Sequence, residues 1–171
     1  MRDTLVLTVI GTDKTGLVQS LAEKLSGLGA NWEEARMARL AGQFAGILLV
    51  TVDSTRVDEL VSAMRGLESQ GLQVTARRTP VPPATAGATM FRLQVTAHDR
   101  PGIVRDVSRV LAERGVNVEE LETEVASAAM AGGPLFVARA LVRAPGGVSL
   151  EDLRGRLEAL GGELMVDLTA E

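Results

Sequence analysis

The stretch Asp13-Lys14-Thr15-Gly16-Leu17-Val18 returns 86 residues later as Asp99-Arg100-Pro101-Gly102-Ile103-Val104. At the same offset, a second segment matches: Asn31-Trp32-Glu33-Glu34 corresponds to Asn117-Val118-Glu119-Glu120. A repeat with a fixed offset indicates how many structural units a chain contains before any single element is assigned. The sequence therefore predicts two similar domains in tandem.

The segment between the two copies marks the expected boundary. Residues 80–88 read Pro-Val-Pro-Pro-Ala-Thr-Ala-Gly-Ala. Proline lacks the amide hydrogen that helices and sheets require, so this segment is expected to be a linker. The first domain is then expected to span residues 1–79 and the second residues 89–171.

Within each copy, the apolar pattern predicts the order strand, helix, strand, strand, helix, strand. In the first copy the expected strands are 5–10, 31–40, 44–52 and 72–79, and the expected helices are 17–28 and 57–67. In the second copy the expected strands are 90–97, 117–126, 135–142 and 163–168, and the expected helices are 103–114 and a segment after Ser149. This order is typical of the α+β, ferredoxin-like βαββαβ fold, a four-stranded antiparallel sheet with two helices on one face.

The ends of the helices carry local signals. Gly27 and Gly29 are expected to stop the first helix, whose apolar face is predicted to include Val18. Thr55 with Asp58 has the pattern of a capping box, and Ser149 with Asp152 three residues on is expected to begin the last helix.

The first strand of each copy alternates, and one set of positions is apolar in both copies: Leu5, Leu7 and Val9, and Phe91, Leu93 and Val95. These residues are expected to face the helices. The opposite positions differ, with Val6, Thr8 and Ile10 in the first copy and Arg92, Gln94 and Thr96 in the second. A bare sheet face that is apolar is expected to be covered, so the two sheets are not expected to be equally buried.

The charge distribution argues against direct binding of nucleic acid. The formal net charge is −4, with nine basic and nine acidic residues in 1–80 and nine and thirteen in 88–171. Neither half has the excess of basic residues that phosphate binding requires. Aromatic residues make up 2% of the chain, so base stacking is poorly provided for as well.

Several other classes of function are also excluded or disfavoured. The chain has no cysteine and one histidine, which excludes disulfides, thiolate metal sites, cysteine nucleophiles and a histidine metal cluster. His98 has no recognisable nucleophile as partner, so we expect neither an enzyme nor a bound cofactor or metal. No apolar run reaches the ~18 residues of a membrane span, and no signal peptide is recognised, so a cytoplasmic protein is expected.

The repeated turn leads from a strand into a helix, where backbone N–H groups and a partial positive charge can hold a carboxylate. Gly16 and Gly102 would let a small amino acid approach the backbone, and a side-chain oxygen of Asn31 or Asn117 could accept its ammonium group. A second interpretation needs no ligand: the aspartates that open the turns cap the helices, and the glycines satisfy backbone geometry.

Other residues also allow two interpretations. His98 either binds a ligand and makes binding pH-sensitive, or is a partly exposed turn histidine. Arg36 and Arg39 either bind an anion or lie on a solvated strand face. Trp32 is expected to be a packing or interface residue. The second copy has six extra residues around 127–133, which form either a flap or an ordinary variable loop.

The turn Asp-(Lys/Arg)-(Thr/Pro)-Gly-(Leu/Ile)-Val, with the helix and the Asn-opened strand that follow, resembles the ACT domain, a ferredoxin-like module that senses small molecules, often amino acids. The run from Glu34 to Gly46 resembles the glycine cleavage system transcriptional repressor family, whose members are free-standing tandem ACT proteins. The resemblance implies regulation linked to glycine through a protein partner, such as a LysR-type transcriptional activator, rather than through DNA.

In related ACT domains, ligands lie between modules, near the strand-to-helix turn of one and the second strand of another, which implies a homo-oligomer. On this sequence the implied ligand-binding residues are Asp13, Lys14, Thr15, Gly16, Leu17, Asn31, His98, Asp99, Arg100, Pro101, Gly102, Ile103 and Asn117. Ligand is expected first at the second turn, which keeps His98 and Pro101. Two alternatives stay open: a regulatory subunit of an amino-acid biosynthetic enzyme, and an interaction scaffold whose sites are empty.

Overall fold

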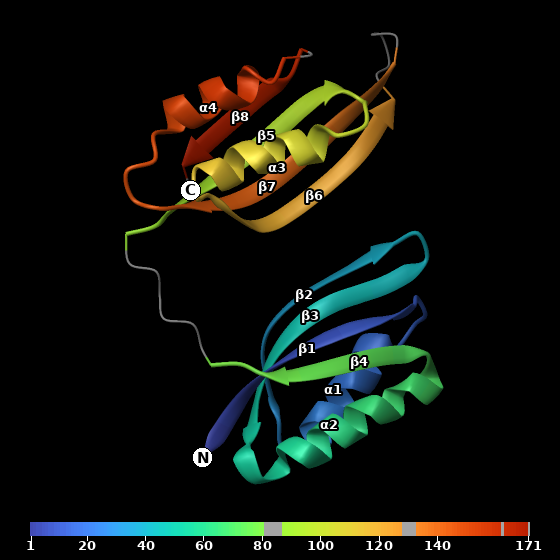
Figure 1. Cartoon of the computed structure of the whole chain (residues 1–171). Coiled ribbons are helices and arrows are strands. Elements are labelled where there is room, and N and C mark those ends of the chain that lie inside the picture. Colours follow the sequence, from blue (N-terminus) through green and yellow to red (C-terminus); the bar gives the residue numbers. More distant parts are fainter. Residues whose placement is uncertain (81–86, 128–132, 162, 171) are drawn as a thin grey trace. The chain divides into compact units, whose positions relative to one another are not determined.

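The computed structural model describes residues 1–80, 87–127, 133–161 and 163–170 (Figure 1). Its contacts divide the chain into two compact units, Met1–Pro83 and Ala84–Glu171, which are described one at a time below. Most of the predicted linker and most of the extra loop of the second copy lie outside the described residues.

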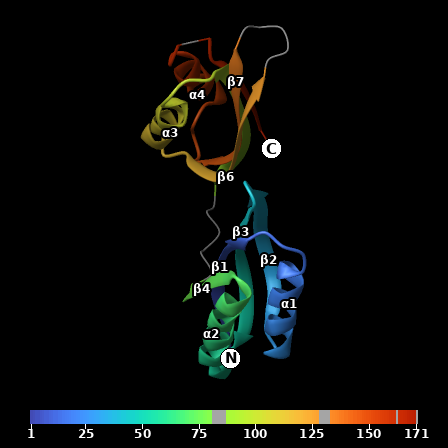
Figure 2. The same ribbon diagram turned by 90° about the vertical axis from the view of Figure 1, so that its right-hand side faces the viewer.

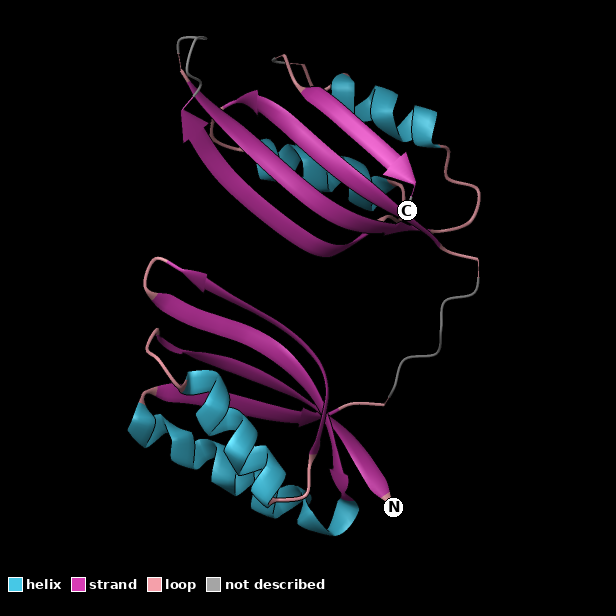
Figure 3. Cartoon of the chain, turned by 180° about the vertical axis from the view of Figure 1, so that it is seen from behind, coloured by secondary structure: helices cyan, strands magenta, loops and turns pink. Residues whose placement is uncertain are grey.

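Domain 1 is a four-stranded antiparallel sheet with its helices on one face (Figures 2 and 3). Its elements are β1 Arg2–Thr12, α1 Leu17–Gly27, β2 Asn31–Leu40, β3 Gln43–Asp53, the 3₁₀ helix η1 Ser54–Arg56, α2 Val57–Arg65, the 3₁₀ helix η2 Gly66–Gln70 and β4 Leu72–Arg78. The strand order is β2-β3-β1-β4.

Domain 2 repeats this architecture. Its elements are β5 Thr89–His98, α3 Ile103–Glu113, β6 Asn117–Ser127, β7 Pro134–Ala144, α4 Leu150–Glu158 and β8 Met165–Ala170. The strand order β6-β7-β5-β8 matches that of domain 1 strand for strand. The predicted fold class, two ferredoxin-like βαββαβ modules of the α+β type, is therefore confirmed.

The core of each domain lies between the sheet and the helices. Leu7 and Val9 of β1 are fully buried and pack with Leu21 of α1 and Leu60 of α2 in one apolar cluster. Burial of each such side chain stabilises the fold by roughly 1.5–3 kcal/mol. The inward positions of β5 are likewise buried in the cluster of domain 2. The predicted inward faces of both first strands are thus confirmed.

Glycines end the first helix of each domain, as predicted for α1. Gly29 has a φ of 67°, and the N–H of Ala30 donates a 3.0 Å hydrogen bond to the carbonyl of Leu25. The corresponding hydrogen bond of α3 measures 2.9 Å, and Gly115 has the same φ of 67°. This closing pattern satisfies helix carbonyls and needs a left-handed residue, which glycine adopts without steric cost.

The predicted capping box of α2 is wrong. Thr55 lies in η1, where its N–H donates a 2.9 Å hydrogen bond to the carboxylate of Asp53. The α-helix begins two residues later, at Val57, and no side chain caps it. Asp53, at the end of β3, is the capping residue instead, and the hydroxyl of Thr55 also donates to its carboxylate, at 2.6 Å.

The other helix signals have mixed outcomes. The N–H of Asp152 donates a 3.4 Å hydrogen bond to Oγ of Ser149, so the start of α4 is confirmed. Val18 was expected on the inner face of α1 but is 47% exposed. It follows Leu17 directly and therefore points about 100° away from the buried stripe.

The outer face of the domain 1 sheet is apolar and open within that domain. Val6 pairs with Leu49 and Thr8 pairs with Ile47 on this face. The helices lie on the opposite face of the sheet (Figure 3). Ile47 is accordingly 53% exposed. The idea that something covers this face stays a prediction.

Candidate functional site

Each strand-to-helix turn is anchored to the neighbouring hairpin of its own domain. In domain 1 the N–H of Asp13 donates to the carbonyl of Gly42 at 2.9 Å. In domain 2 the N–H of Asp99 donates to the carbonyl of Pro134, also at 2.9 Å. The two copies thus hold the turn against the connection between the second and third strands in the same way.

Gly16 and Gly102 precede the helices with φ of 91° and 92°. Only glycine adopts this conformation without strain, so the sequence repeat preserves a backbone requirement. Among the residues that the structure describes, neither Asp13 nor Asp99 makes a side-chain hydrogen bond to a helix N–H, so the interpretation of these aspartates as caps is not supported. The N–H groups of each first helical turn are therefore left for solvent or a ligand.

The first turn borders a hollow of about 340 Å³ lined by residues 13–19 and Phe44. Asp13 makes an ion pair with Arg39 of β2, and Nζ of Lys14 donates to the carbonyl of Gln70. Arg39 therefore contacts the turn from an exposed position on its strand. The sequence gives no signal for this pair, because the β2–β3 hairpin brings Arg39 to the turn only in the folded domain.

At the second turn the polar side-chain contacts differ. His98 Nε2 lies 3.4 Å from Oε2 of Glu163, and Nη1 of Arg100 lies 3.2 Å from Oδ2 of Asp106. Arg105 donates to Oδ1 of the same aspartate at 2.9 Å. These hydrogen bonds, first from Arg105 and then from Arg100, hold the pKa of the Asp106 carboxyl below its usual value.

The remaining turn residues divide between surface and core. Asp99 and Pro101 are exposed, as is Thr15 in the first turn. Leu17 and Ile103 are buried in the cores of their domains, with 5% and 2% exposed surface. At these last two positions a ligand can reach only the backbone, so their side chains serve the fold.

The predicted asparagines lie at the opposite end of each sheet from the turn. Asn31 pairs with Thr51 of β3, which pairs in turn with Thr4 at the start of β1. The turn follows Thr12, eight residues further along β1, or about 26 Å at the rise of a strand. Asn117 has the equivalent position in domain 2. No single domain brings its own turn and asparagine together.

Each asparagine is part of an internal contact that recurs in both domains and that the sequence interpretation missed. Nδ2 of Asn31 donates a 2.8 Å hydrogen bond to Oε1 of Glu33, which also accepts one from Oγ1 of Thr51 at 2.8 Å. These bonds, first from Asn31 and then from Thr51, lower the pKa of the Glu33 carboxyl. The pairing register shifts at Glu33, so a β-bulge turns its carboxylate back toward Asn31.

Domain 2 has the same arrangement with a stronger second donor. Nδ2 of Asn117 donates to Oε1 of Glu119 at 2.7 Å, and Nε of Arg143 donates to the same oxygen at 2.7 Å. Asn117, followed by Arg143, lowers the pKa of the Glu119 carboxyl. Both asparagines use the amide nitrogen for this contact, so the amide oxygen is the group that could accept a ligand ammonium.

Neither a metal site nor a membrane span is found in residues 1–80, 87–127, 133–161 and 163–170. Among them, no group of three or more His, Cys, Asp or Glu side chains is placed to hold a metal ion. No helix in the same ranges is long and apolar enough to cross a membrane.

Comparison with known proteins places the two domains in one family. Family models described as ACT domain match residues 3–77 and residues 91–162. The chain is 28% identical over 119 residues to the glycine cleavage system transcriptional repressor of Escherichia coli (strain K12), and equally to that of Shigella flexneri. The match covers 68% of this chain and 62% of the relative, so the chain spans less than two thirds of these relatives.

Solved structures support the fold over the whole chain. A crystal structure of an unknown protein from Galdieria sulphuraria is 32% identical, with a TM-score of 0.87 over 100% of this chain and 99% of that one. A structure provisionally assigned as a glycine cleavage system transcriptional repressor is 20% identical, with a TM-score of 0.76 over 100% and 98%, and shows the fold alone. The chain belongs to the ACT domain family and carries two ACT domains in tandem.

Proposed function

We propose that this chain is a non-catalytic regulatory protein that binds a small amino acid at its strand-to-helix turns and acts on a protein partner. The observation that carries the proposal is the matched geometry of Gly16 and Gly102, each of which opens a helix without a side-chain cap. The similarity to glycine cleavage system transcriptional repressors supports a regulatory role and makes glycine the first ligand to test.

The carboxylate of the ligand would lie on the N–H groups of the first helical turn. A helix N-terminus stabilises an anion by roughly 0.3–1 kcal/mol at an exposed site, so one turn alone gives weak binding. The hollow beside residues 13–19 offers room for a small ligand at the first turn. At the second turn, His98, Asp99, Arg100 and Pro101 are exposed.

The ammonium group needs an acceptor from a different module. Asn31 and Asn117 lie about 26 Å along the sheet from the turn of their own domain. A site that uses both a turn and an asparagine must therefore combine two modules, which requires either the other domain or a second copy of the chain. We propose that the ligand stabilises this pairing of modules. The size of the shift toward the paired state is set by the difference in ligand affinity between the paired and unpaired states.

A protein partner fits the charge of the chain better than nucleic acid does. The net charge is −4, and binding to a phosphate backbone depends on an excess of Lys and Arg. A LysR-type transcriptional activator is the partner we propose to test first. The test is co-purification of the chain with such an activator, with and without glycine, beside a mobility-shift assay of the chain alone on DNA. Binding to DNA without the activator would contradict the proposal.

Ligand binding is tested by calorimetric titration with glycine, serine, alanine and leucine. The proposal predicts binding of at least one of them in the millimolar range or tighter, and failure of all four would overturn it. Gly102→Val should abolish binding at the second turn. Gly147→Val is the matched control, because Gly147 also has a φ of 92° but lies in the loop before α4. Far-UV circular dichroism verifies that both variants fold.

A further inference from the structure

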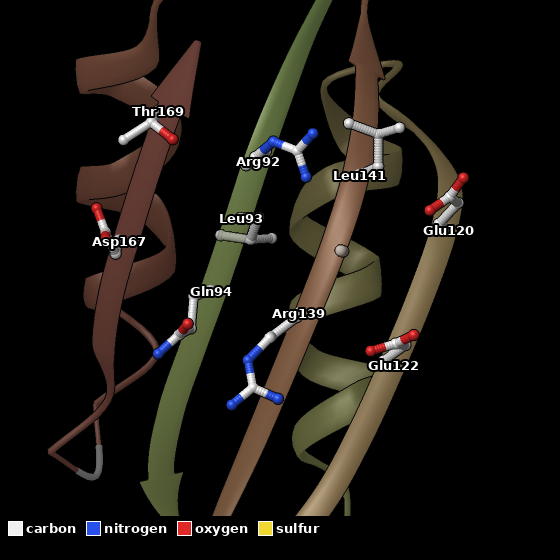
Figure 4. A pocket seen from close by; sticks show the side chains of 10 residues that line it. Arg92, Leu93, Gln94, Glu120, Glu122, Arg139, Leu141, Asp167 and Thr169 are labelled. Atoms are coloured by element: carbon white, nitrogen blue, oxygen red, sulfur yellow. The ribbon is translucent and has the colours of Figure 1, made fainter. Parts of the chain in front are cut away.

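The open face of the domain 2 sheet contains a charged hollow of about 420 Å³ (Figure 4). Side chains from all four strands line it, and both signs of charge are present. The lining residues are Arg92, Leu93, Gln94, Glu120, Glu122, Arg139, Ala140, Leu141, Asp167 and Thr169. The hollow is open to solvent and has room for a small metabolite.

Strand register brings four of these residues into one row across the sheet. Arg139 of β7 pairs with Glu122 of β6 on one side and with Gln94 of β5 on the other. Gln94 pairs in turn with Asp167 of β8. The row therefore reads acidic, basic, amide, acidic, and Arg92 lies one step along β5 on the same face. A cation at the centre is flanked by a carboxylate on each edge strand.

Part of this row has no partner in the described structure. Nη1 of Arg139 donates a 2.8 Å hydrogen bond to Glu124, which leaves the other N–H groups of its guanidinium as donors. Within the ranges that the structure describes, Glu122, Gln94 and Asp167 make no side-chain hydrogen bond or ion pair. The hollow thus presents unpaired carboxylates and an unpaired amide around a cation.

The equivalent row of domain 1 is built differently. Glu122, Arg139, Gln94 and Asp167 correspond by register to a row without an acidic residue, namely Arg36, Ile47, Thr8 and Thr75. Because the same fold forms with isoleucine at the position of Arg139, folding does not require the charged row. The acidic residues and the central arginine of this row occur in domain 2 and not in the equivalent row of domain 1.

We propose that this hollow binds a small zwitterion of the size of a free amino acid. Its carboxylate would accept hydrogen bonds from the Arg139 guanidinium, and its ammonium would donate to Oε1 of Gln94 and to the carboxylate of Asp167. A ligand with both charges can use the Arg139 guanidinium and the Asp167 carboxylate together, whereas a ligand with a single charge can use only one of them. The site lies four residues along β5 from His98, or about 13 Å from the turn, and does not depend on the proposed turn sites.

The experiment is a two-dimensional ¹H–¹⁵N NMR titration of the full chain with glycine and with serine. Acetate and methylammonium serve as probes that carry one charge each. The proposal predicts amide shifts in β5, β7 and β8 for the amino acids and at least tenfold weaker binding of both single-charge probes. Binding should also weaken as ionic strength rises, because the charges are exposed to solvent.

Arg139→Met and Asp167→Asn should each weaken binding at least fivefold. Thr75→Asn is the matched control at the position equivalent to Asp167 in domain 1 and should leave binding unchanged. Amide shifts confined to residues 99–103 would overturn the sheet-face site and support the turn site. Amide shifts confined to the sheet face would support the sheet-face site and count against the turn site. Equal binding of acetate and glycine, or unchanged binding by the Arg139 and Asp167 variants, would also overturn it.

Discussion

Asn117 donates a 2.7 Å hydrogen bond to Glu119 at the β-bulge of β6. Asn31 makes the same contact with Glu33 in β2, at 2.8 Å and at an equivalent bulge. An isolated asparagine followed two residues later by glutamate carries no strong structural signal. The contact recurs with the same bulge in both domains, which indicates that it helps to set the backbone conformation at the start of the second strand of each domain.

Asn117→Ala should raise the pKa of the Glu119 carboxyl, because the hydrogen bond from Asn117 is the main cause of its lowered pKa. A carboxyl with a lowered pKa in the folded state stabilises the fold above its unfolded pKa of about 4.3 and loses that effect as pH falls through the folded pKa. The variant should therefore have a lower free energy of unfolding than wild type at pH 7, and the difference should disappear in acid, where the carboxyl is protonated in both proteins. Carboxyl ¹³C titration measures the pKa directly, and an unchanged value would contradict the assignment.

Gly11→Ala should destabilise the protein by roughly 1–3 kcal/mol, the usual cost of overpacking. A Cβ at Gly11 would lie 2.3 Å from the carbonyl oxygen of Gly71, so β1 or the start of β4 must move. Gly66→Ala is the matched control, since a Cβ there meets nothing within 4 Å and φ is −60°. Urea denaturation of both variants measures the difference. Equal stabilities would mean that β4 shifts at no cost.

Removal of the ion pair between Asp13 and Arg39 should cost little stability. Its side chains are 31% and 67% exposed, and exposed pairs contribute about 0.2–1 kcal/mol. A double-mutant cycle with Asp13→Asn and Arg39→Met should give a coupling free energy in that range, and it should shrink at 1 M NaCl. A coupling above that range, or one that salt leaves unchanged, would show that the pair is shielded from solvent.

Ile47→Arg would give domain 1 the residue that domain 2 has at the equivalent position, Arg139. If the outer face is open, the free energy of unfolding should change by less than about 0.5 kcal/mol, as for ordinary surface substitutions. If another surface covers this face, the variant should instead lose stability or change oligomeric state. Chemical denaturation together with light scattering separates the two outcomes.

The sequence predicted the element order well because the pattern of apolar residues is local. Leu7 and Val9 alternate as a strand requires, and the helix stop at Gly29 needs only a glycine that can adopt positive φ. The capping box was wrong for an equally local reason, since the Asp53 carboxylate accepts hydrogen bonds from both the N–H and the hydroxyl of Thr55. A single sequence does not show which of two neighbouring capping residues accepts the hydrogen bond at the start of the helix.

The candidate sites were less predictable, because they depend on where strands lie relative to one another. The sequence identified the turns and the asparagines as chemically suitable. It did not show that Asn31 lies at the far end of the sheet from the turn of its own domain, nor that Arg39 contacts Asp13. Both facts follow from antiparallel pairing, which reverses the chain direction at each hairpin.

The sequence by itself determined that this protein is two copies of one βαββαβ unit and that Gly16 and Gly102 open matching helices, because periodicity and positive φ are properties of short segments. Tertiary structure alone decided which charges meet. Glu122, Arg139, Gln94 and Asp167 are scattered over 74 positions of the chain and form one row only because the register of three strand pairs aligns them. Register is fixed by burial of the opposite sheet face, where a one-residue slip would expose the core.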